Sequence, residues 1–312
     1  MVVCFFCIAN CMKALILALT SIFFAPVAQC QSAGGETIRV LSWNIYMLPG
    51  VFGSSNVLRA EAIGRVLSSG QYDVIVFQEA FDQKARRVIS GLLAKAYPYQ
   101  VGPANQKLFS IKTNSGLWIF SRYPISEAHS IVFQTRHGLD ALSRKGALLA
   151  ELNVNGNHIQ IVATHLQNSG ETWRKQSQCA EIFTNLLKKY QRTGIPQIVC
   201  GDFNINRHVT TVDYQLMLKT LDVVDCNSEM KDAFSYDRIA NDLHVERGTD
   251  RDLIDYILIR NNLSFTDSNN GKIRVFQKQW NNTHKDLSDH YSLETEITFR
   301  NLNEALTVAA PR

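Results

Sequence analysis

The stretch QIVCGDFNIN, residues 197–206, decides the fold that we expect. Residues 197–202 are mainly apolar and β-branched and predict a buried strand. Asp202 ends that strand and Asn204 follows it, either as an Asx turn or as functional groups. The end of a strand is where a sheet presents side chains to a shared cleft. The stretch therefore predicts a buried strand that carries polar groups towards a cleft.

Further segments of the chain are short and β-branched in the same way. They are residues 38–43, 73–78, 116–121, 147–154, 158–165, 254–259 and 291–299. Asn155-Gly156, between two of these segments, is a strong signal for a two-residue β-hairpin. The pattern predicts strands that pair as hairpins, and it does not favour a purely parallel sheet.

Amphipathic helices are predicted between some of these strands. One apolar face consists of Leu58, Ala62, Ile63, Val66 and Leu67, and another of Cys179, Ile182, Phe183, Leu186, Leu187 and Tyr190. The second helix is expected to end before Gly194-Ile195-Pro196. No glycine-rich phosphate loop follows any strand. Strands interleaved with helices indicate mixed sheets that are covered by helices.

The composition is that of a globular protein. The chain has 312 residues, of which 46% are hydrophobic and 19% charged, with a formal net charge of +4. These values exclude a disordered chain, a coiled coil, a collagen-like repeat and a polytopic membrane protein. The mild charge neither requires nor excludes a polyanionic partner. We expect residues 31–302 to form a single domain, followed by a tail at residues 303–312.

The N-terminal segment has the order of a secretory signal peptide, which we assign to residues 1–30. Lys13 precedes an apolar run at residues 14–25 that is short for a spanning helix, and small residues follow. Translation starts either at Met1 or at Met12. We expect a secreted protein, and the alternative is an uncleaved membrane anchor. After cleavage Cys179, Cys200 and Cys226 remain, and Cys200 falls in a buried strand, where it is expected to be a small core residue.

Polar residues that bind metal ions or phosphate recur at the predicted strand ends. They are Asn44, Glu79, His165, Asp202, Asn204, Asp255, Asp289 and His290. Asn44 alone could be a turn former, and His165 alone could be a core histidine. Asp255 is harder to explain in this way, because an unpaired carboxylate in an apolar strand is costly. The repetition of the pattern indicates that these side chains share one site.

Several blocks, in this order along the chain, resemble the endonuclease/exonuclease/phosphatase superfamily. The blocks are LSWNIYMLPG (41–50), VIVFQEAFD (74–82), THLQ (164–167), GDFNIN (201–206), LIDYILI (253–259) and LSDHYSL (287–293). The resemblance implies an α/β fold of the DNase I type: a four-layered α/β sandwich in which helices flank two mixed β-sheets. NIYMLPG, EAFD and DALSRKG (140–146) are similar to secreted neutral sphingomyelinases of the bacterial type.

That resemblance implies a metal-dependent phosphodiesterase, most similar to a sphingomyelinase C that hydrolyses sphingomyelin to ceramide and phosphocholine. Its substrate would be a phospholipid at a membrane surface, which the enzyme meets as a peripheral protein. One alternative is a secreted Mg²⁺-dependent nuclease of the same fold acting on DNA or RNA. A catalytically inactive binding module is a third class. No obligate protein partner is indicated.

The resemblance also implies roles for single residues in phosphodiester hydrolysis. Glu79, with Asn44, would bind Mg²⁺, or else Mn²⁺ or Co²⁺, through hard oxygen ligands. His290 would be the general base that activates water, oriented by Asp255. Asp202 would align the water or contact the metal-bound phosphate.

The remaining implied residues surround this chemistry. Asn204 and His165 would donate hydrogen bonds to phosphate oxygens. Asp289 would bind a second ion or support the other ligands.

Three further residues are candidates for substrate recognition. Asp140 and Lys145 have the spacing of an Asp–Lys pair that sphingomyelinases carry near the substrate; Lys145 could contact phosphate, position a loop together with Asp140, or be a solvated surface lysine. Phe81, two residues after Glu79, could face a choline group by a cation–π contact or be a core aromatic residue. The chain departs from the family before its last block, where secreted sphingomyelinases usually have a long aromatic hairpin. Here only Phe276 and Trp280 are available, which puts membrane insertion in doubt.

Overall fold

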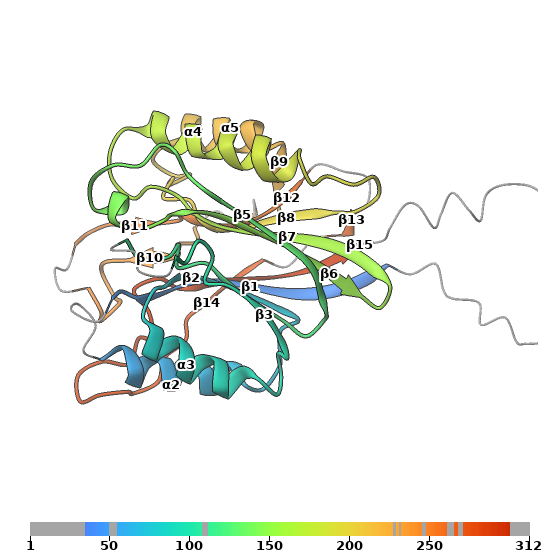
Figure 1. Ribbon diagram of the computed structural model, residues 1–312. Helices are drawn as coiled ribbons and strands as arrows, with labels where there is room; N and C mark the ends of the chain where they lie inside the picture. The colour runs from blue at the N-terminus through green and yellow to red at the C-terminus, as the bar shows by residue number, and fades with distance from the viewer. Residues whose placement is uncertain are drawn as a thin grey trace, which may run out of the picture. The chain divides into compact units, whose positions relative to one another are not determined.

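Two β-sheets lie face to face between two layers of helices in the computed structural model (Figure 1). The structure describes residues 35–49, 55–107, 112–226, 229–230, 232–244, 248–260, 265–267 and 271–299. The predicted four-layered α/β sandwich is thereby confirmed. The signal peptide predicted at residues 1–30 and the tail at residues 303–312 lie outside the described residues. Within the described ranges, no helix is both long enough and apolar enough to cross a membrane.

The first sheet is mixed and has the strand order β13-β15-β1-β2-β4-β3, with β14 also paired to β15. Its strands are β1 (Glu36–Met47), β2 (Val74–Ala80), β3 (Tyr99–Val101), β4 (Trp118–Ser121), β13 (Phe265–Asp267), β14 (Lys272–Arg274) and β15 (Ser292–Phe299). Strand β1 runs parallel to β2 and antiparallel to β15. The ends of β1 and β2 therefore finish at the same edge of the sheet.

The second sheet is also mixed, with the order β5-β6-β7-β8-β12-β9. Its strands are β5 (Ile125–Val132), β6 (Gly146–Val154), β7 (Asn157–His165), β8 (Gln197–Asp202), β9 (Val223–Asp225) and β12 (Asp255–Arg260). Asn155 and Gly156 join β6 to β7 with φ of 54° and 95°, as the predicted two-residue hairpin requires. Two short strands, β10 (Tyr236–Asp237) and β11 (Arg251–Asp252), pair with each other outside both sheets.

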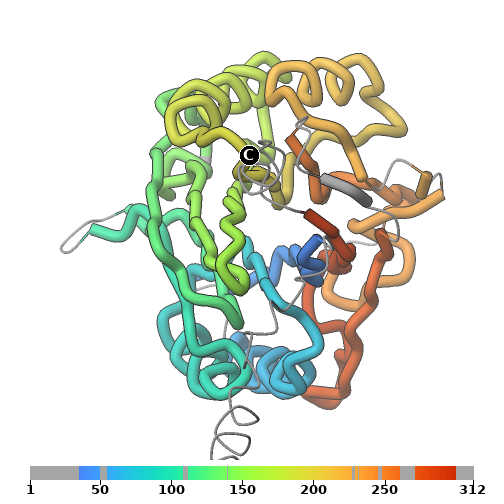
Figure 2. The backbone as a smooth tube through the Cα atoms, turned by 90° about the vertical axis from the view of Figure 1, so that its right-hand side faces the viewer, coloured from blue at the N-terminus to red at the C-terminus, as the bar shows by residue number. Residues whose placement is uncertain are grey.

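Helices cover the outer face of each sheet, as the view in Figure 2 also shows. On the first sheet lie α2 (Asn56–Leu67) and α3 (Gln83–Leu93). On the second lie α5 (Thr211–Leu221) and α4 (Thr172–Ile182), which continues as a π-helical turn, η2 (Phe183–Leu187). A short 3₁₀ helix, η1 (Gly138–Leu142), precedes β6.

The prediction that Leu58 belongs to the buried face of its helix is wrong. Leu58 is 50% exposed, and the buried face of α2 runs through Ala60, Ile63 and Leu67. Arg59 also lies on the buried face, because its guanidinium donates to the carbonyl oxygens of Ile45 and Leu287. Packing against the end of β1 therefore sets the orientation of the helix.

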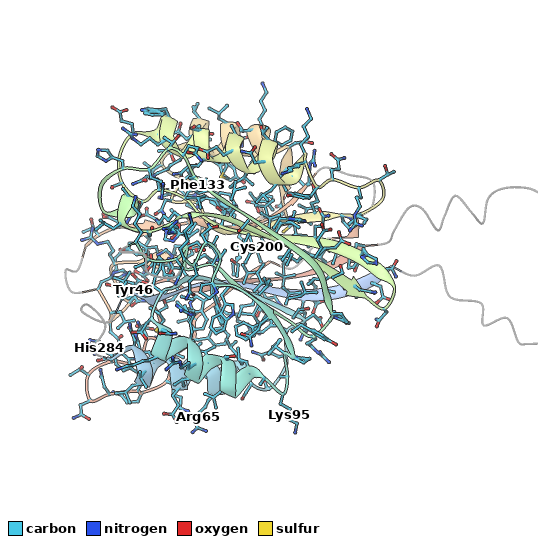
Figure 3. The ribbon with its side chains drawn as sticks, in the orientation of Figure 1. Tyr46, Arg65, Lys95, Phe133, Cys200 and His284 are labelled. Carbon is cyan, nitrogen blue, oxygen red and sulfur yellow. The ribbon has the colours of Figure 1, made fainter. Side chains whose placement is uncertain are left out.

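Three apolar cores follow from this layering. The core between the sheets contains Cys200, which is fully buried between the two sheets (Figure 3), so its prediction as a core residue is confirmed. In β1, Ile38 and Val40 face this core, whereas Leu41 and Trp43 pack beneath the helices of the first sheet. This period of two determines which polar side chains at the strand ends point between the sheets.

Candidate active site

The site continues the inner face of the second sheet beyond its apolar core. In β8 the inward residues Ile198 and Cys200 are followed by Asp202. The pairing places Asp202 opposite His165 of β7 on one side and opposite Asp255 of β12 on the other. Alternation along three neighbouring strands therefore delivers three polar side chains to one edge of the sheet.

Asn44 brings the first sheet to the same point. It follows Ile38 and Val40 on the inner face of β1 and is fully buried. Its Nδ2 donates to Oδ2 of Asp202 at 3.1 Å, and its Oδ1 accepts from the backbone N–H of Tyr46. The site is thus built between the two sheets.

His290 and Asp255 form a buried pair. Nδ1 of His290 lies 2.8 Å from Oδ2 of Asp255, and its Nε2 lies 3.7 Å from Oδ2 of Asp202. Burial alone would lower the pKa of His290, but the carboxylates of Asp255 and Asp202 raise that pKa well above its usual value. A carboxylate that stabilises the imidazolium makes the ring a stronger base for a water molecule.

Glu79 is held in the site by an unusual backbone conformation. Ile75 and Phe77 of β2 pack under the helices, and regular alternation would place Glu79 on the same face. The φ of Glu79 is 56°, in the left-handed region, so the strand does not continue regularly at this residue. Tyr46 and Asn204, next to the same site, also have positive φ values, of 49° and 53°. Such conformations cost about 1–3 kcal/mol each and cluster at functional sites.

The carboxylate of Glu79 is suited to a cation. Its Oε2 is buried and has no hydrogen-bond partner among the described residues. Burial and the charge of Asp289 raise the pKa of Glu79 to about 7. An orphaned carboxylate oxygen in an acidic site is the kind of ligand that a hard divalent ion prefers.

His165 is buried between Glu79 and Lys145. Its Nε2 lies 3.0 Å from Nζ of Lys145, and its Nδ1 lies 3.9 Å from Oε1 of Glu79. Burial, together with the charges of Lys145 and His290, lowers the pKa of His165 well below its usual value. The ring is therefore neutral, and it is not the isolated core histidine that the sequence also allowed.

Asp140 and Lys145 meet as an ion pair beside this histidine. Nζ of Lys145 lies 2.9 Å from Oδ1 of Asp140, and it also donates to the carbonyl oxygen of Leu166 at 3.0 Å. Oδ2 of Asp140 accepts the backbone N–H of Asn168 at 2.9 Å. Lys145 is buried, so the pair is part of the site's interior.

Asn204 folds back onto Asp202. Its backbone N–H donates to Oδ1 of Asp202 at 2.9 Å, which is the Asx turn that the sequence allowed. Its side-chain Nδ2 donates to the carbonyl oxygen of Leu166 at 3.2 Å. The turn and the site are thus the same structure.

The other two predicted residues lie near the site. Asp289 is nearly buried, and its Oδ1 lies 3.3 Å from Oγ of Ser288. The half-buried Phe81 packs against Gly116, where an added Cβ would lie 3.0 Å from the ring. Its assignment to substrate binding stays a prediction.

Four supporting residues were not identified from the sequence. The ring of Tyr236 lies 4.9 Å from that of His290, and Oγ of Ser235 accepts the backbone N–H of Asp255 at 3.2 Å. Oγ of Ser288 donates to the carbonyl oxygen of Asn44, and Nε1 of Trp43 donates to that of His290. Ser288 and Trp43 lie inside the blocks that carry the family resemblance, so the sequence offered a signal for them. Tyr236 and Ser235 lie outside these blocks, and no sequence signal indicated them.

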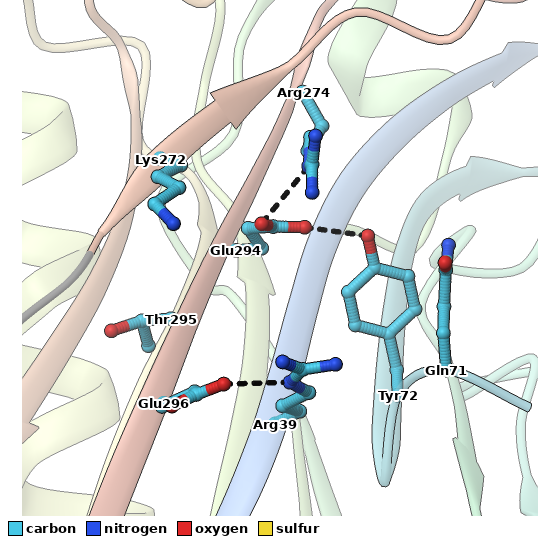
Figure 4. A pocket seen from close by; sticks show the side chains of 8 residues that line it. All are labelled: Arg39, Gln71, Tyr72, Lys272, Arg274, Glu294, Thr295 and Glu296. Carbon is cyan, nitrogen blue, oxygen red and sulfur yellow. Dashed lines mark hydrogen bonds and ion pairs between the residues drawn. The ribbon is translucent and has the colours of Figure 1, made fainter.

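A hollow lies on the outer face of the first sheet, away from this site (Figure 4). Arg39 pairs with Glu296 at 2.7 Å, and Arg274 pairs with Glu294 at 3.0 Å. Tyr72 donates its hydroxyl to the same Glu294. Each of the two carboxylates in this hollow therefore has an arginine partner.

Comparisons with known proteins agree with this geometry. The model of the Endonuclease/Exonuclease/phosphatase family matches residues 41–290. The chain is 27% identical over 316 residues to sphingomyelinase C from Bacillus cereus, covering 88% of this chain and 92% of that protein. The solved structure of sphingomyelinase C from Streptomyces griseocarneus is 24% identical, with a TM-score of 0.73 over 84% of this chain and 99% of that one. A mutant of beta toxin from Staphylococcus aureus with bound magnesium ions is 23% identical, with a TM-score of 0.70 over 83% and 99%.

Proposed function

Because the chain belongs to the endonuclease/exonuclease/phosphatase family and is a phosphodiesterase, we propose that it is a sphingomyelinase C, which hydrolyses sphingomyelin to ceramide and phosphocholine. One observation carries the proposal. The buried His290–Asp255 pair, with Nδ1 and Oδ2 2.8 Å apart, shares one site with the orphaned carboxylate oxygen of Glu79. Burial raises the pKa of Glu79, and the nearby charge of His290 acts to lower that pKa. A base and a cation ligand in one site are what hydrolysis of a phosphodiester requires. The relatives named sphingomyelinase C support the choice of substrate.

The reaction follows from the contacts of His290. In its neutral form the ring takes a proton from a water molecule, whose oxygen forms a bond to phosphorus. The bond between phosphorus and the ceramide oxygen breaks, and that oxygen takes up a proton from the solvent. Asp255 stabilises the imidazolium, while Asp202 lies 3.7 Å from Nε2 of His290, where it aligns the water.

A divalent cation would be held by Glu79 with the amide oxygen of Asn44. When bound, it would neutralise charge on the phosphate and so favour attack on phosphorus. Asp202, Asp255 and His290 form another compact group, with ligand atoms within 4.8 Å of one another. The hydrogen bond between His290 and Asp255 already accounts for that group, so we assign it to proton transfer. Mg²⁺ is the proposed ion, and Mn²⁺ and Co²⁺ remain alternatives.

The enzyme is proposed to be secreted and to meet its phospholipid at a membrane surface. The order of residues in the N-terminal segment supports secretion. The two aromatic residues before the last block are engaged in the fold: Phe276 contacts Trp43 at 5.0 Å between ring centroids, and Trp280 stacks on His284 at 5.4 Å. Peripheral contact with the membrane therefore does not depend on their insertion.

A side-by-side assay tests this function. The purified protein is given vesicles of sphingomyelin, vesicles of phosphatidylcholine and plasmid DNA, each with Mg²⁺. We expect release of phosphocholine from sphingomyelin, with loss of that activity in His290→Ala and Glu79→Ala. Glu61→Gln, on the exposed face of α2, is the control. Cleavage of DNA without phosphocholine release would instead support a nuclease.

A further inference from the structure

Every donor of the buried Lys145 ammonium has a partner within the protein. The partners are Oδ1 of Asp140 at 2.9 Å, the carbonyl oxygen of Leu166 at 3.0 Å and Nε2 of His165 at 3.0 Å. An ammonium has three N–H groups, and here all three are used. Lys145 has no N–H left with which to bind a phosphate oxygen.

This arrangement determines where His165 carries its proton. An ammonium can only donate, so Nε2 of His165 must accept, and a neutral imidazole that accepts at Nε2 is protonated at Nδ1. Nδ1 is buried and has no hydrogen-bond partner among the described residues. It points to the Glu79 side of the site, where Oε1 lies 3.9 Å away. An unused N–H in a phosphodiesterase site is available to an oxygen of the substrate.

A competing acceptor shows why the lysine is needed. Oδ2 of Asp202 lies 3.4 Å from Nε2 of His165, on the same side of the ring as Lys145. Without the ammonium, a proton at Nε2 would be attracted to this carboxylate. Nδ1 would then present a lone pair towards Glu79 and towards the anionic phosphate, which is repulsive.

We propose that Lys145 is a positioning residue that sets the tautomer of His165, so that Nδ1–H is the donor for a non-bridging oxygen of the phosphodiester. Lys145 acts through His165 and does not touch the substrate. Asp140 anchors the lysine to the loop after β7, because its second oxygen accepts the N–H of Asn168. The role of the donor rests on the proposed phosphodiesterase reaction, whereas the tautomer does not.

The tautomer can be read directly by two-bond ¹H–¹⁵N correlation NMR on the full chain labelled with ¹⁵N-histidine, in the absence of substrate. The signal of His165 is identified by its loss in His165→Gln. We expect Nδ1 of His165 to be protonated and Nε2 to be unprotonated in the wild type. In Lys145→Met the proton should move to Nε2, and in Lys145→Arg, which keeps a charged donor, it should stay at Nδ1. Lys188→Met, an exposed lysine, is the matched control.

The same variants are then assayed on sphingomyelin vesicles. Loss of one charge-stabilising donor predicts a fall in kcat of about 10²-fold for Lys145→Met, with little change in KM and partial rescue in Lys145→Arg. Thermal melts show whether each variant is folded. If Lys145→Met does not fold, the tautomer and the activity of Lys145→Arg still test the proposal.

The outcomes separate the two proposals. A proton on Nε2 in the wild type, or an unchanged tautomer in folded Lys145→Met, would overturn the role of Lys145. The expected tautomers in a protein that releases no phosphocholine would support that role and contradict the substrate.

Discussion

Nδ2 of Asn44 donates a hydrogen bond to Oδ2 of Asp202 at 3.1 Å, across the space between the two sheets. The two residues are 158 positions apart in the chain, and each ends the inward face of its strand. Asp202 also faces His165 and His290, at 3.4 and 3.7 Å. The contact therefore joins the side expected to bind the cation to the side that transfers the proton.

Replacing Asn44 by Ala should weaken both stability and activity. Burial and the nearby Asp255 already raise the pKa of Asp202 to about 6, so its buried carboxylate depends on the donors around it. Loss of one donor to a buried charge should lower the free energy of unfolding by about 1–3 kcal/mol. Urea unfolding and phosphocholine release measure the two effects. Asn185→Ala, exposed on η2, is the control and should change neither. If Asn44→Ala is as stable as the wild type, the contact does not contribute to stability.

The pair of His290 and Asp255 should make stability depend on pH. The pKa of His290 is raised in the folded protein, from an unfolded value of about 6.5. The stabilisation is therefore fully present below that unfolded value and is lost as the pH rises through the raised pKa. In EDTA, the wild type should be stabilised relative to His290→Gln at low pH, and the difference should shrink as the pH rises. Urea unfolding of both proteins across this range gives the difference, and a difference that grows with pH would contradict the pairing.

Glu79→Gln should remove activity and yet stabilise the metal-free protein. Burial and Asp289 raise the pKa of Glu79 to about 7, so the charged form destabilises the fold once the pH exceeds the unfolded value of about 4.5. At alkaline pH in EDTA, the neutral amide should increase the free energy of unfolding by about 1–3 kcal/mol.

Mg²⁺ should reverse this order of stability. The ion should raise the Tm of the wild type and restore its activity after EDTA, because a ligand bound only by the folded state stabilises it. It should leave the Tm of Glu79→Gln unchanged. An equal rise in both proteins would place the ion elsewhere.

Phe276→Ala should affect folding and leave membrane binding unchanged. The ring packs against the buried Trp43 and the core beneath the helices of the first sheet. Its loss should cost about 1–3 kcal/mol of stability, as for other partly buried aromatic residues. Co-sedimentation with sphingomyelin vesicles should be the same as for the wild type. Loss of sedimentation with unchanged stability would instead identify a membrane anchor.

The sequence by itself predicted the central strands of both sheets, though not β5 (Ile125–Val132). It also identified the polar residues at the strand ends, though not the supporting Ser235 and Tyr236. Alternating apolar residues identified β6 and β7, and Asn155-Gly156 identified their turn, because both signals depend only on neighbours along the chain. The polar residues at the ends of the strands, such as Asp202 and Asp255, were visible for the same reason. A buried carboxylate at a strand end is costly unless it is paired or binds a ligand, which marks it as a candidate site residue.

The tertiary structure alone decided how these groups act on one another. The order of strands places β8 between β7 and β12, so that Asp202 faces both His165 and Asp255. From its residue type Lys145 is expected at the surface, but it is buried because η1, the last residue of β7 and the loop after β7 supply acceptors for all its donors. The exposure of Leu58 likewise follows from the docking of Arg59 on the end of β1. Local sequence sets each strand's period, whereas burial and hydrogen-bond partners depend on segments that only folding brings together.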